Sequence, residues 1–162
     1  MDTASLAQIK KEAATLGKEE LVALVVRLSK HKKENKELAA YLLFYGNDES
    51  SFVSDAKEEM DAMFAEVNQH HAYLAKKTIR KILRLVSKHS KFSSHKTTEV
   101  ELLIHFCTHY KKLPAVIRQS NVLYNLYQRQ IAKLAKTLSA LHEDIQWDCK
   151  QQIQSLFGDD FI

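Results

Sequence analysis

Two histidines and a glutamate in this chain have the spacing that a shared metal ion requires. Glu101, His105 and His109 follow one another at intervals of four residues, so they lie along one face of an α-helix. Two imidazoles one helical turn apart can bind the same zinc ion. The apolar residues of this segment define a buried side that points nearly opposite: Val100, Leu103, Phe106, Cys107 and Tyr110. A solvent-facing pair on one helix lacks further ligands, so the sequence predicts no metal site and no cofactor.

Motifs that would indicate catalysis are missing from the sequence. The three glycines are isolated, which leaves no glycine-rich loop to cradle a phosphate, and there is no Gly-x-Ser-x-Gly elbow. Phe106 stands where the zinc-protease pattern requires a glutamate after His105. Neither Cys107 nor Cys149 lies in a recognisable nucleophile motif. We therefore predict no catalytic residue and favour a non-enzymatic protein; an enzyme whose site is assembled from distant residues stays an alternative.

A basic segment in the middle of the chain is its strongest charge feature. Residues 67–98 contain eight lysines and arginines and no acidic residue, whereas the whole chain has a net charge of +4. At 100° per residue, a helix over 72–90 gathers its apolar side chains on one side. The cations that gather opposite, together with the lysine that follows, form what we call the basic face: Lys77, Arg80, Lys81, Arg84, Lys88 and Lys91. The basic face is the candidate surface for binding an anion or a partner.

Three interpretations of the basic face are open. The preceding predicted helix, over 51–69, is strongly acidic, so an antiparallel hairpin would set an acidic surface beside the basic one. This internally paired or solvated face is the favoured interpretation, although exposed pairs contribute only about 0–1 kcal/mol each. An acidic protein partner comes second. Nucleic acid comes third, because few aromatic residues stand among the cations to stack on bases.

Apolar residues recur at helical spacing along almost the whole chain, and the breaks between the helical segments are short. The predicted helices occupy residues 4–16, 18–33, 36–45, 51–69, 72–90, 98–112, 115–141 and 144–157. Three glycines and one proline are too few for the turns of a sheet protein of 162 residues. The sequence therefore predicts an all-α fold: a single domain over 1–162, with seven or eight helices packed as antiparallel hairpins in an irregular bundle or a short solenoid-like array.

Two features of the C-terminal part bear on association with other chains. The predicted helix over 115–141 has apolar residues at heptad spacing, which allows a coiled-coil homodimer. The neutral residues beside that seam favour a core helix of the chain's own domain instead. Trp147 projects away from the apolar side of the 144–157 helix, as an interface anchor does; cover by Phe161–Ile162 or by a loop is the favoured reading.

Cysteine usage and hydropathy predict the compartment. Two cysteines give no disulfide framework, and this fits a reducing cytoplasm. The first residues have neither the basic nor the apolar region of a signal peptide. No apolar run approaches the roughly 20 residues of a membrane span. We expect a cytoplasmic protein with no membrane span.

The N-terminal third carries amphipathic signals that resemble those of a known group of proteins. These are Leu16-x-Lys18-Glu19-Glu20-Leu21, then Leu24, Leu28, Asn35-Lys36-Glu37-Leu38 and Tyr41-Leu42. This stretch of about 45 residues resembles the opening of an uncharacterised bacterial all-helical domain family. The resemblance implies a helical fold and a bacterial origin. The family has no assigned activity, so the resemblance implies no functional residue.

Together these features favour one function over its alternatives. The prediction is a non-enzymatic helical protein-interaction module, with an unknown and acidic partner protein. The alternative is a nucleic-acid-binding accessory protein that uses the basic face of the 72–91 segment.

Overall fold

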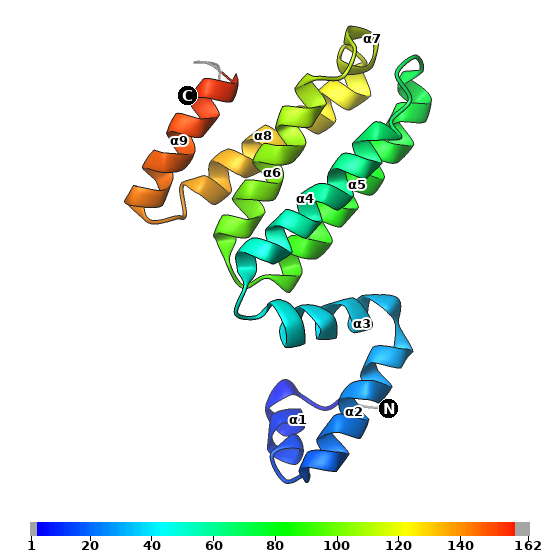
Figure 1. Ribbon diagram of the computed structural model, residues 1–162, viewed down its shortest axis with the longest axis vertical. Coiled ribbons are helices and arrows are strands. Elements are labelled where there is room, and N and C mark those ends of the chain that lie inside the picture. The colour runs from blue at the N-terminus through cyan, green and yellow to red at the C-terminus, as the bar shows by residue number, and fades with distance from the viewer. Residues whose placement is uncertain (1–2, 158–162) are drawn as a thin grey trace. The chain divides into compact units, whose positions relative to one another are not determined.

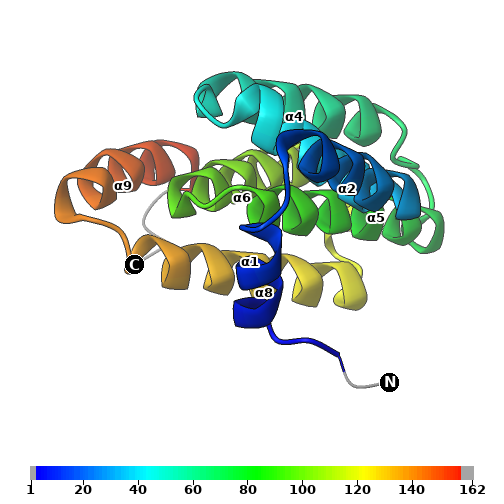
Figure 2. The same cartoon turned by 90° about the horizontal axis from the view of Figure 1, so that it is seen from below.

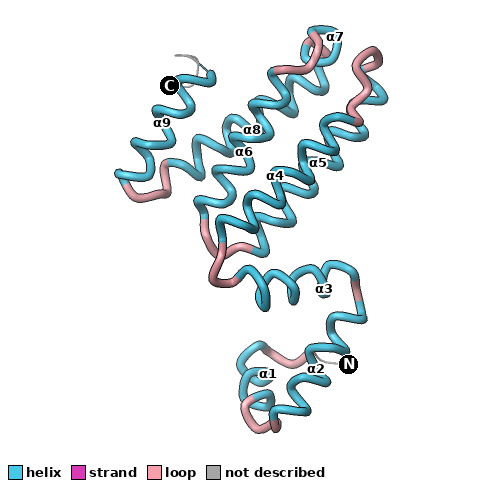
Figure 3. Tube along the Cα trace, viewed as in Figure 1, coloured by secondary structure: helices cyan, strands magenta, loops and turns pink. Residues whose placement is uncertain are grey.

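The computed structural model describes residues 3–157, and every regular element in that range is helical. Figure 3 shows these helices and the short loops that join them. The predicted all-α fold is therefore confirmed. The chain divides into two compact units, Met1–Asn47 and Asp48–Ile162, and each is described by itself. The single domain over 1–162 stays a prediction.

The N-terminal unit is built from three short helices and a π-helical turn. They are α1 (Leu6–Ala13), α2 (Lys18–His31), α3 (Lys33–Ala40) and η1 (Tyr41–Tyr45). A capping box starts α1: the Gln8 N–H donates to Ser5 Oγ, and the Ser5 N–H donates to Gln8 Oε1 at 2.8 Å. Asn35 Nδ2 donates to the Leu28 carbonyl at 3.0 Å. This bond ties the start of α3 to the last turns of α2.

Almost nothing in the N-terminal unit is buried. Among its described residues, Tyr41 alone has the low exposure of a core residue. The apolar side chains of α1 stand in solvent, with Leu6 85% and Ile9 51% exposed. A segment of this length without a core cannot supply its own hydrophobic stabilisation. The N-terminal unit therefore leaves most of its large apolar side chains exposed.

The C-terminal unit is a helical bundle. Its elements are α4 (Glu49–Ala65), α5 (Ala72–Phe92), α6 (Lys96–Lys111), α7 (Ala115–Arg118), α8 (Asn121–Leu138) and α9 (Glu143–Phe157). α4, α5 and α6 run up, down and up as antiparallel hairpins, and α8 packs against α6 (Figures 1 and 2). The core lies between them and includes Met60, Ile79, Phe106 and Leu134, each with no exposed area. This core holds α4, α5 and α6 in a fixed register.

The segment predicted as one helix over 115–141 is two helices. α7 is a single turn that buries Ile117, and the chain then becomes extended at Ser120 before α8 begins. Ser120 is a residue type that favours the position before a helix. The Arg118 side chain turns back, and its Nε donates to the Leu113 carbonyl at 2.8 Å. The heptad pattern therefore does not form one continuous seam, and α8 contributes buried Leu123, Leu134 and Leu138 to its own unit.

Membrane insertion through a helix finds no support in residues 3–157. None of the helices there has the length and apolar character that crossing a bilayer demands.

Candidate functional site

The basic face lies on the outer side of α5. Lys77, Arg80, Lys81, Arg84 and Lys91 are exposed, whereas Lys88 is partly buried. The opposite side of α5, which includes Ile79, Ile82 and Val86, is buried in the core. None of the five exposed cations forms an ion pair with any residue of the described range 3–157. Five exposed positive charges therefore lie along one face of this helix.

Two acidic residues of α4 contact histidines and not these five cations. Glu59 Oε2 lies 3.4 Å from Nε2 of His89 on the inner part of α5. Asp61 contacts two histidines of α6. Within residues 3–157 the carboxylates of α4 therefore form no ion pair with these five cations. The reason is geometric: α4 packs on α5 and α6 together, so its polar residues meet the residues that line that junction.

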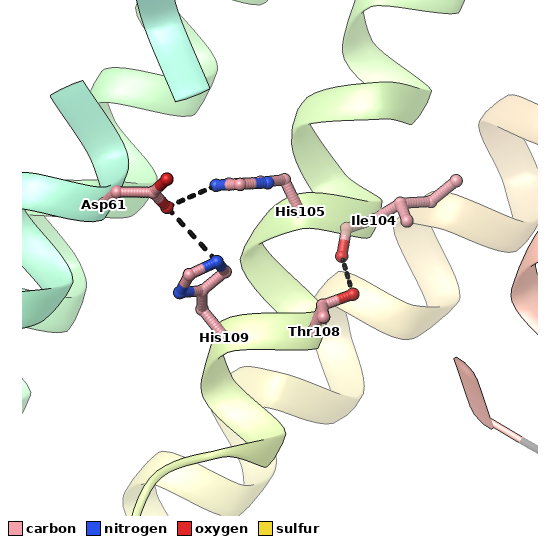
Figure 4. A network of polar contacts seen from close by, with 5 residues as sticks. All are labelled: Asp61, Ile104, His105, Thr108 and His109. Atoms are coloured by element: carbon pink, nitrogen blue, oxygen red, sulfur yellow. Dashed lines mark hydrogen bonds and ion pairs between the residues drawn. The ribbon is translucent and has the colours of Figure 1, made fainter. Parts of the chain in front are cut away.

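A three-residue cluster joins α4 to α6, and we call it the histidine cluster. The Oδ1 atom of Asp61 lies 2.6 Å from Nε2 of His105 and 3.2 Å from Nε2 of His109 (Figure 4). The two imidazole rings lie 4.5 Å apart between centroids. The side chains of His105 and His109 are 19% and 25% exposed, and that of Asp61 is 49% exposed. The two histidines thus face α4 at the edge of solvent rather than facing solvent alone.

Glu101, the third residue on the sequence-predicted line, is not part of the cluster. Its Oε2 atom lies 2.8 Å from Nζ of Lys57, one turn earlier along both helices. The carboxylate that meets the histidines is Asp61, which the sequence analysis did not single out. A signal for it exists: Lys57 and Asp61 are spaced four apart, as Glu101 and His105 are, with complementary charge. Parallel packing of the two helices turns that match into two contacts.

Burial and nearby charges act on the titration of His109. The pKa of His109 lies below its ordinary value, first because partial burial disfavours the charged imidazolium and next because His105 is close. The Asp61 carboxylate acts in the opposite direction and only partly offsets this shift. His109 is therefore biased toward the neutral imidazole at neutral pH. The Phe64 ring lies 5.2 Å from the His109 ring and supplies an apolar wall.

An apolar surface covers most of α2 in the N-terminal unit. We define the α2 apolar surface by six side chains that are each between 37% and 56% exposed: Leu21, Val22, Leu24, Val25, Val26 and Leu28. At 100° per residue these positions span an arc of about 200°. α3 packs on part of it, and a groove of about 380 Å³ runs between Val25, Leu28, Leu38 and Leu42. The sequence predicted an amphipathic helix here, and the structure shows that the N-terminal unit by itself leaves the apolar side of this helix open.

Trp147 on α9 is 65% exposed. Together with Leu138, Gln146 and Ile153 it lines a cavity of about 380 Å³ between α8 and α9. The cover predicted from Phe161–Ile162 falls outside the residues that the structure describes. The indole is an open apolar surface within the described range.

The cysteines give no support to nucleophilic catalysis. Cys107 is fully buried, and burial raises its pKa to about 12. Cys149 is partly buried, and its pKa is raised by burial and by the nearby carboxylates of Glu101 and Asp148. A thiol that is protonated at neutral pH is a weak nucleophile. Catalysis through either cysteine is therefore disfavoured.

Comparisons with protein-family models, with curated proteins and with solved structures find no match to this chain.

Proposed function

We propose that this chain is a non-enzymatic helical protein-interaction module, and that the α2 apolar surface supplies its main contact area. The observation that carries the proposal is the exposure of all six apolar side chains of that surface. A helix whose apolar arc exceeds half its circumference is typical of one with neighbours on more than one side. Within its own unit α2 has α3 as its main neighbour. A partner protein would provide the missing cover.

The free energy gained by burying the α2 side chains, compared with the cost of association, indicates that the interface extends beyond α2. Complete burial of a valine or leucine side chain contributes about 1.5–3 kcal/mol, so six half-exposed ones contribute about 6 kcal/mol. Association costs roughly 4–15 kcal/mol in lost freedom of motion. Further apolar contacts are needed, and η1 offers Leu42, Leu43 and Phe44, which are 62%, 68% and 77% exposed. A partner that covers both elements would bind with useful affinity.

The test uses a surface variant and a matched control. In Val22→Ser/Val25→Ser/Leu28→Ser the apolar surface is interrupted, whereas Lys10→Ser/Lys11→Ser/Lys18→Ser changes three exposed residues of the same unit. Tagged versions are purified from the source cells, and the recovered proteins are quantified against the unaltered chain. We expect the first variant to lose a partner that the second retains, or to lose concentration-dependent self-association in sedimentation velocity. Equal recovery and equal sedimentation of all three would contradict the proposal.

Nucleic-acid binding is the second candidate, because five cations of the basic face are exposed and unpaired within residues 3–157. Labelled single- and double-stranded oligonucleotides are titrated at several salt concentrations. Neutralised phosphates would give an affinity that falls steeply with salt, with a slope of about −0.9 per contact on duplex DNA. Arg80→Glu/Lys81→Glu/Arg84→Glu would abolish such binding, and Lys10→Glu/Lys11→Glu/Lys18→Glu is the charge-matched control. Equal loss in both variants would show non-specific attraction and would remove this candidate.

A further inference from the structure

We propose that Asp61, His105 and His109 form a binding site for a divalent transition-metal ion of the zinc class, held between α4 and α6. The site belongs to the C-terminal unit and is independent of the α2 apolar surface, which lies in the N-terminal unit. A pair of histidines on one helix would be a weak indication by itself. Here a second helix, α4, adds the Asp61 carboxylate as a third ligand.

The possible ligand atoms of three side chains converge on one point. One ligand atom from each of Asp61, His105 and His109 lies within 4.8 Å of the other two. Figure 4 shows both imidazoles turned toward the same carboxylate oxygen. The hydroxyl of nearby Thr108 donates to the Ile104 carbonyl at 2.8 Å, so it is engaged in its own helix. The donor set at this point is therefore two nitrogens and one carboxylate.

The distances between these ligand atoms are close to those between the ligands of a bound metal ion. Zinc–nitrogen and zinc–oxygen bonds of about 2.0–2.1 Å in a tetrahedron place ligand atoms about 3.3 Å apart. The 3.2 Å between Asp61 Oδ1 and His109 Nε2 already fits. The 2.6 Å to His105 Nε2 must lengthen, and the half-exposed Asp61 side chain can rotate to allow this.

The surroundings leave room for a fourth ligand. A surface depression of about 300 Å³ borders Asp61, Phe64 and His109. Three protein ligands with one open position are the arrangement of zinc sites that bind water or an exogenous ligand. The exposed cation Lys112 also borders this depression and disfavours a metal cation. The Asp61 carboxylate compensates for that charge.

The donor set also selects the class of metal. Imidazole nitrogen suits zinc, cobalt, nickel and copper, whereas magnesium and calcium prefer sites made of oxygen ligands. An ion bound here would join two helices that are 44 residues apart at Asp61 and His105. It would therefore bind the folded chain and raise its unfolding temperature.

The experiment uses the full chain, freed of metal with a chelator, and cobalt(II) chloride as the probe. We expect one equivalent of Co²⁺ to produce the visible absorption of a tetrahedral site, Zn²⁺ to displace it, and the unfolding temperature to rise. Loss of a direct ligand in Asp61→Asn, His105→Gln or His109→Gln should weaken Zn²⁺ binding by at least about 100-fold. His70→Gln/His71→Gln removes two exposed histidines elsewhere and should bind as the unaltered chain does.

Two outcomes would overturn the proposal. One is the absence of a saturable Co²⁺ spectrum in the unaltered chain, which needs no variant to fold. The other is stoichiometric binding that Asp61→Asn and His105→Gln leave unchanged while His70→Gln/His71→Gln removes it. Circular dichroism of each variant confirms that it is folded. For a variant that is not, broadening of the His105 and His109 proton resonances by Co²⁺ in the unaltered chain gives the answer.

Discussion

Asp61 on α4 lies 2.6 Å from His105 on α6, and the two residues are 44 positions apart. The same offset joins Lys57 to Glu101 at 2.8 Å and Glu49 to Ser93 at 2.5 Å. α4 and α6 therefore run parallel, and their polar residues meet at a constant register. Along this junction Glu49, Lys57 and Asp61 of α4 all meet residues of α6 or of the turn that precedes it.

The titration of His109 provides the first prediction. Because burial and the neighbouring His105 lower its pKa below the ordinary 6.5, its NMR titration in metal-free protein should have a midpoint below that value. The folded state then binds fewer protons than the unfolded state. The stability that His109 contributes is therefore present above pH 6.5 and is lost as the pH falls below it. Asp61→Asn should lower the midpoint further, since the carboxylate raises the pKa. A midpoint above 6.5 in the unaltered chain would contradict the geometry.

The buried thiol of Cys107 provides the second prediction. In Cys149→Ser, a thiol reagent should not react with the folded chain and should react with one thiol after unfolding, because Cys107 is fully buried. The pKa of Cys107 rises from 9.0 to about 12 on folding. The stability from this group is therefore fully present below pH 9 and is lost as the pH rises toward 12. Urea unfolding across that range should show a smaller loss in Cys107→Ala; rapid reaction of the folded thiol would contradict its placement.

The third prediction contrasts a core leucine with one of the α2 apolar surface. Leu103 has no exposed area, and Leu28 is 53% exposed. Leu103→Ala should cost about 2–5 kcal/mol of unfolding free energy, whereas Leu28→Ala should cost below about 1 kcal/mol. Chemical denaturation of the two variants measures both. An equal loss would mean that α2 is packed within its own chain.

The fourth prediction concerns the start of α6. The Glu49 carboxylate accepts hydrogen bonds from the hydroxyls of Ser93 and Thr98, both of which are buried. Glu49→Ala leaves those hydroxyls without this partner, and we expect a loss of about 1–3 kcal/mol. The control is Glu58→Ala, which removes an exposed glutamate of α4, the helix that begins at Glu49. Similar stability of both variants would show that the contact contributes little.

The helices themselves could largely be predicted from the sequence, because apolar spacing and local breaks decide them. Gly17 and Pro114 lie at helix boundaries, as expected. The break at Ser120 was missed because the apolar pattern continues through it, and the interruption arises from how α7 packs Ile117 into the core. Local pattern gives a helix its faces, but tertiary packing decides where a helix is interrupted.

Only those features of the candidate sites that lie within a single helix could be predicted from the sequence. The basic face and the spacing of His105 and His109 are properties of single helices, so the sequence could single them out. The contact with Asp61 depends on the register between α4 and α6, which periodicity within either helix does not determine. The α2 apolar surface was missed for a related reason: an apolar arc predicts burial, and only the arrangement of its neighbours within the N-terminal unit shows how little of the arc that unit covers.

The measurement that tests the central proposal most directly is photo-cross-linking from α2 in the source cells. A photo-reactive amino acid at Val26, which is 46% exposed on the α2 apolar surface, is compared with one at Lys30, an exposed polar position of the same helix. The interaction module predicts cross-links from position 26 to a second polypeptide, either another copy or a different protein, with far fewer from position 30. Cross-links from position 26 that stay within the same chain would contradict it, because the chain would then cover its own apolar surface.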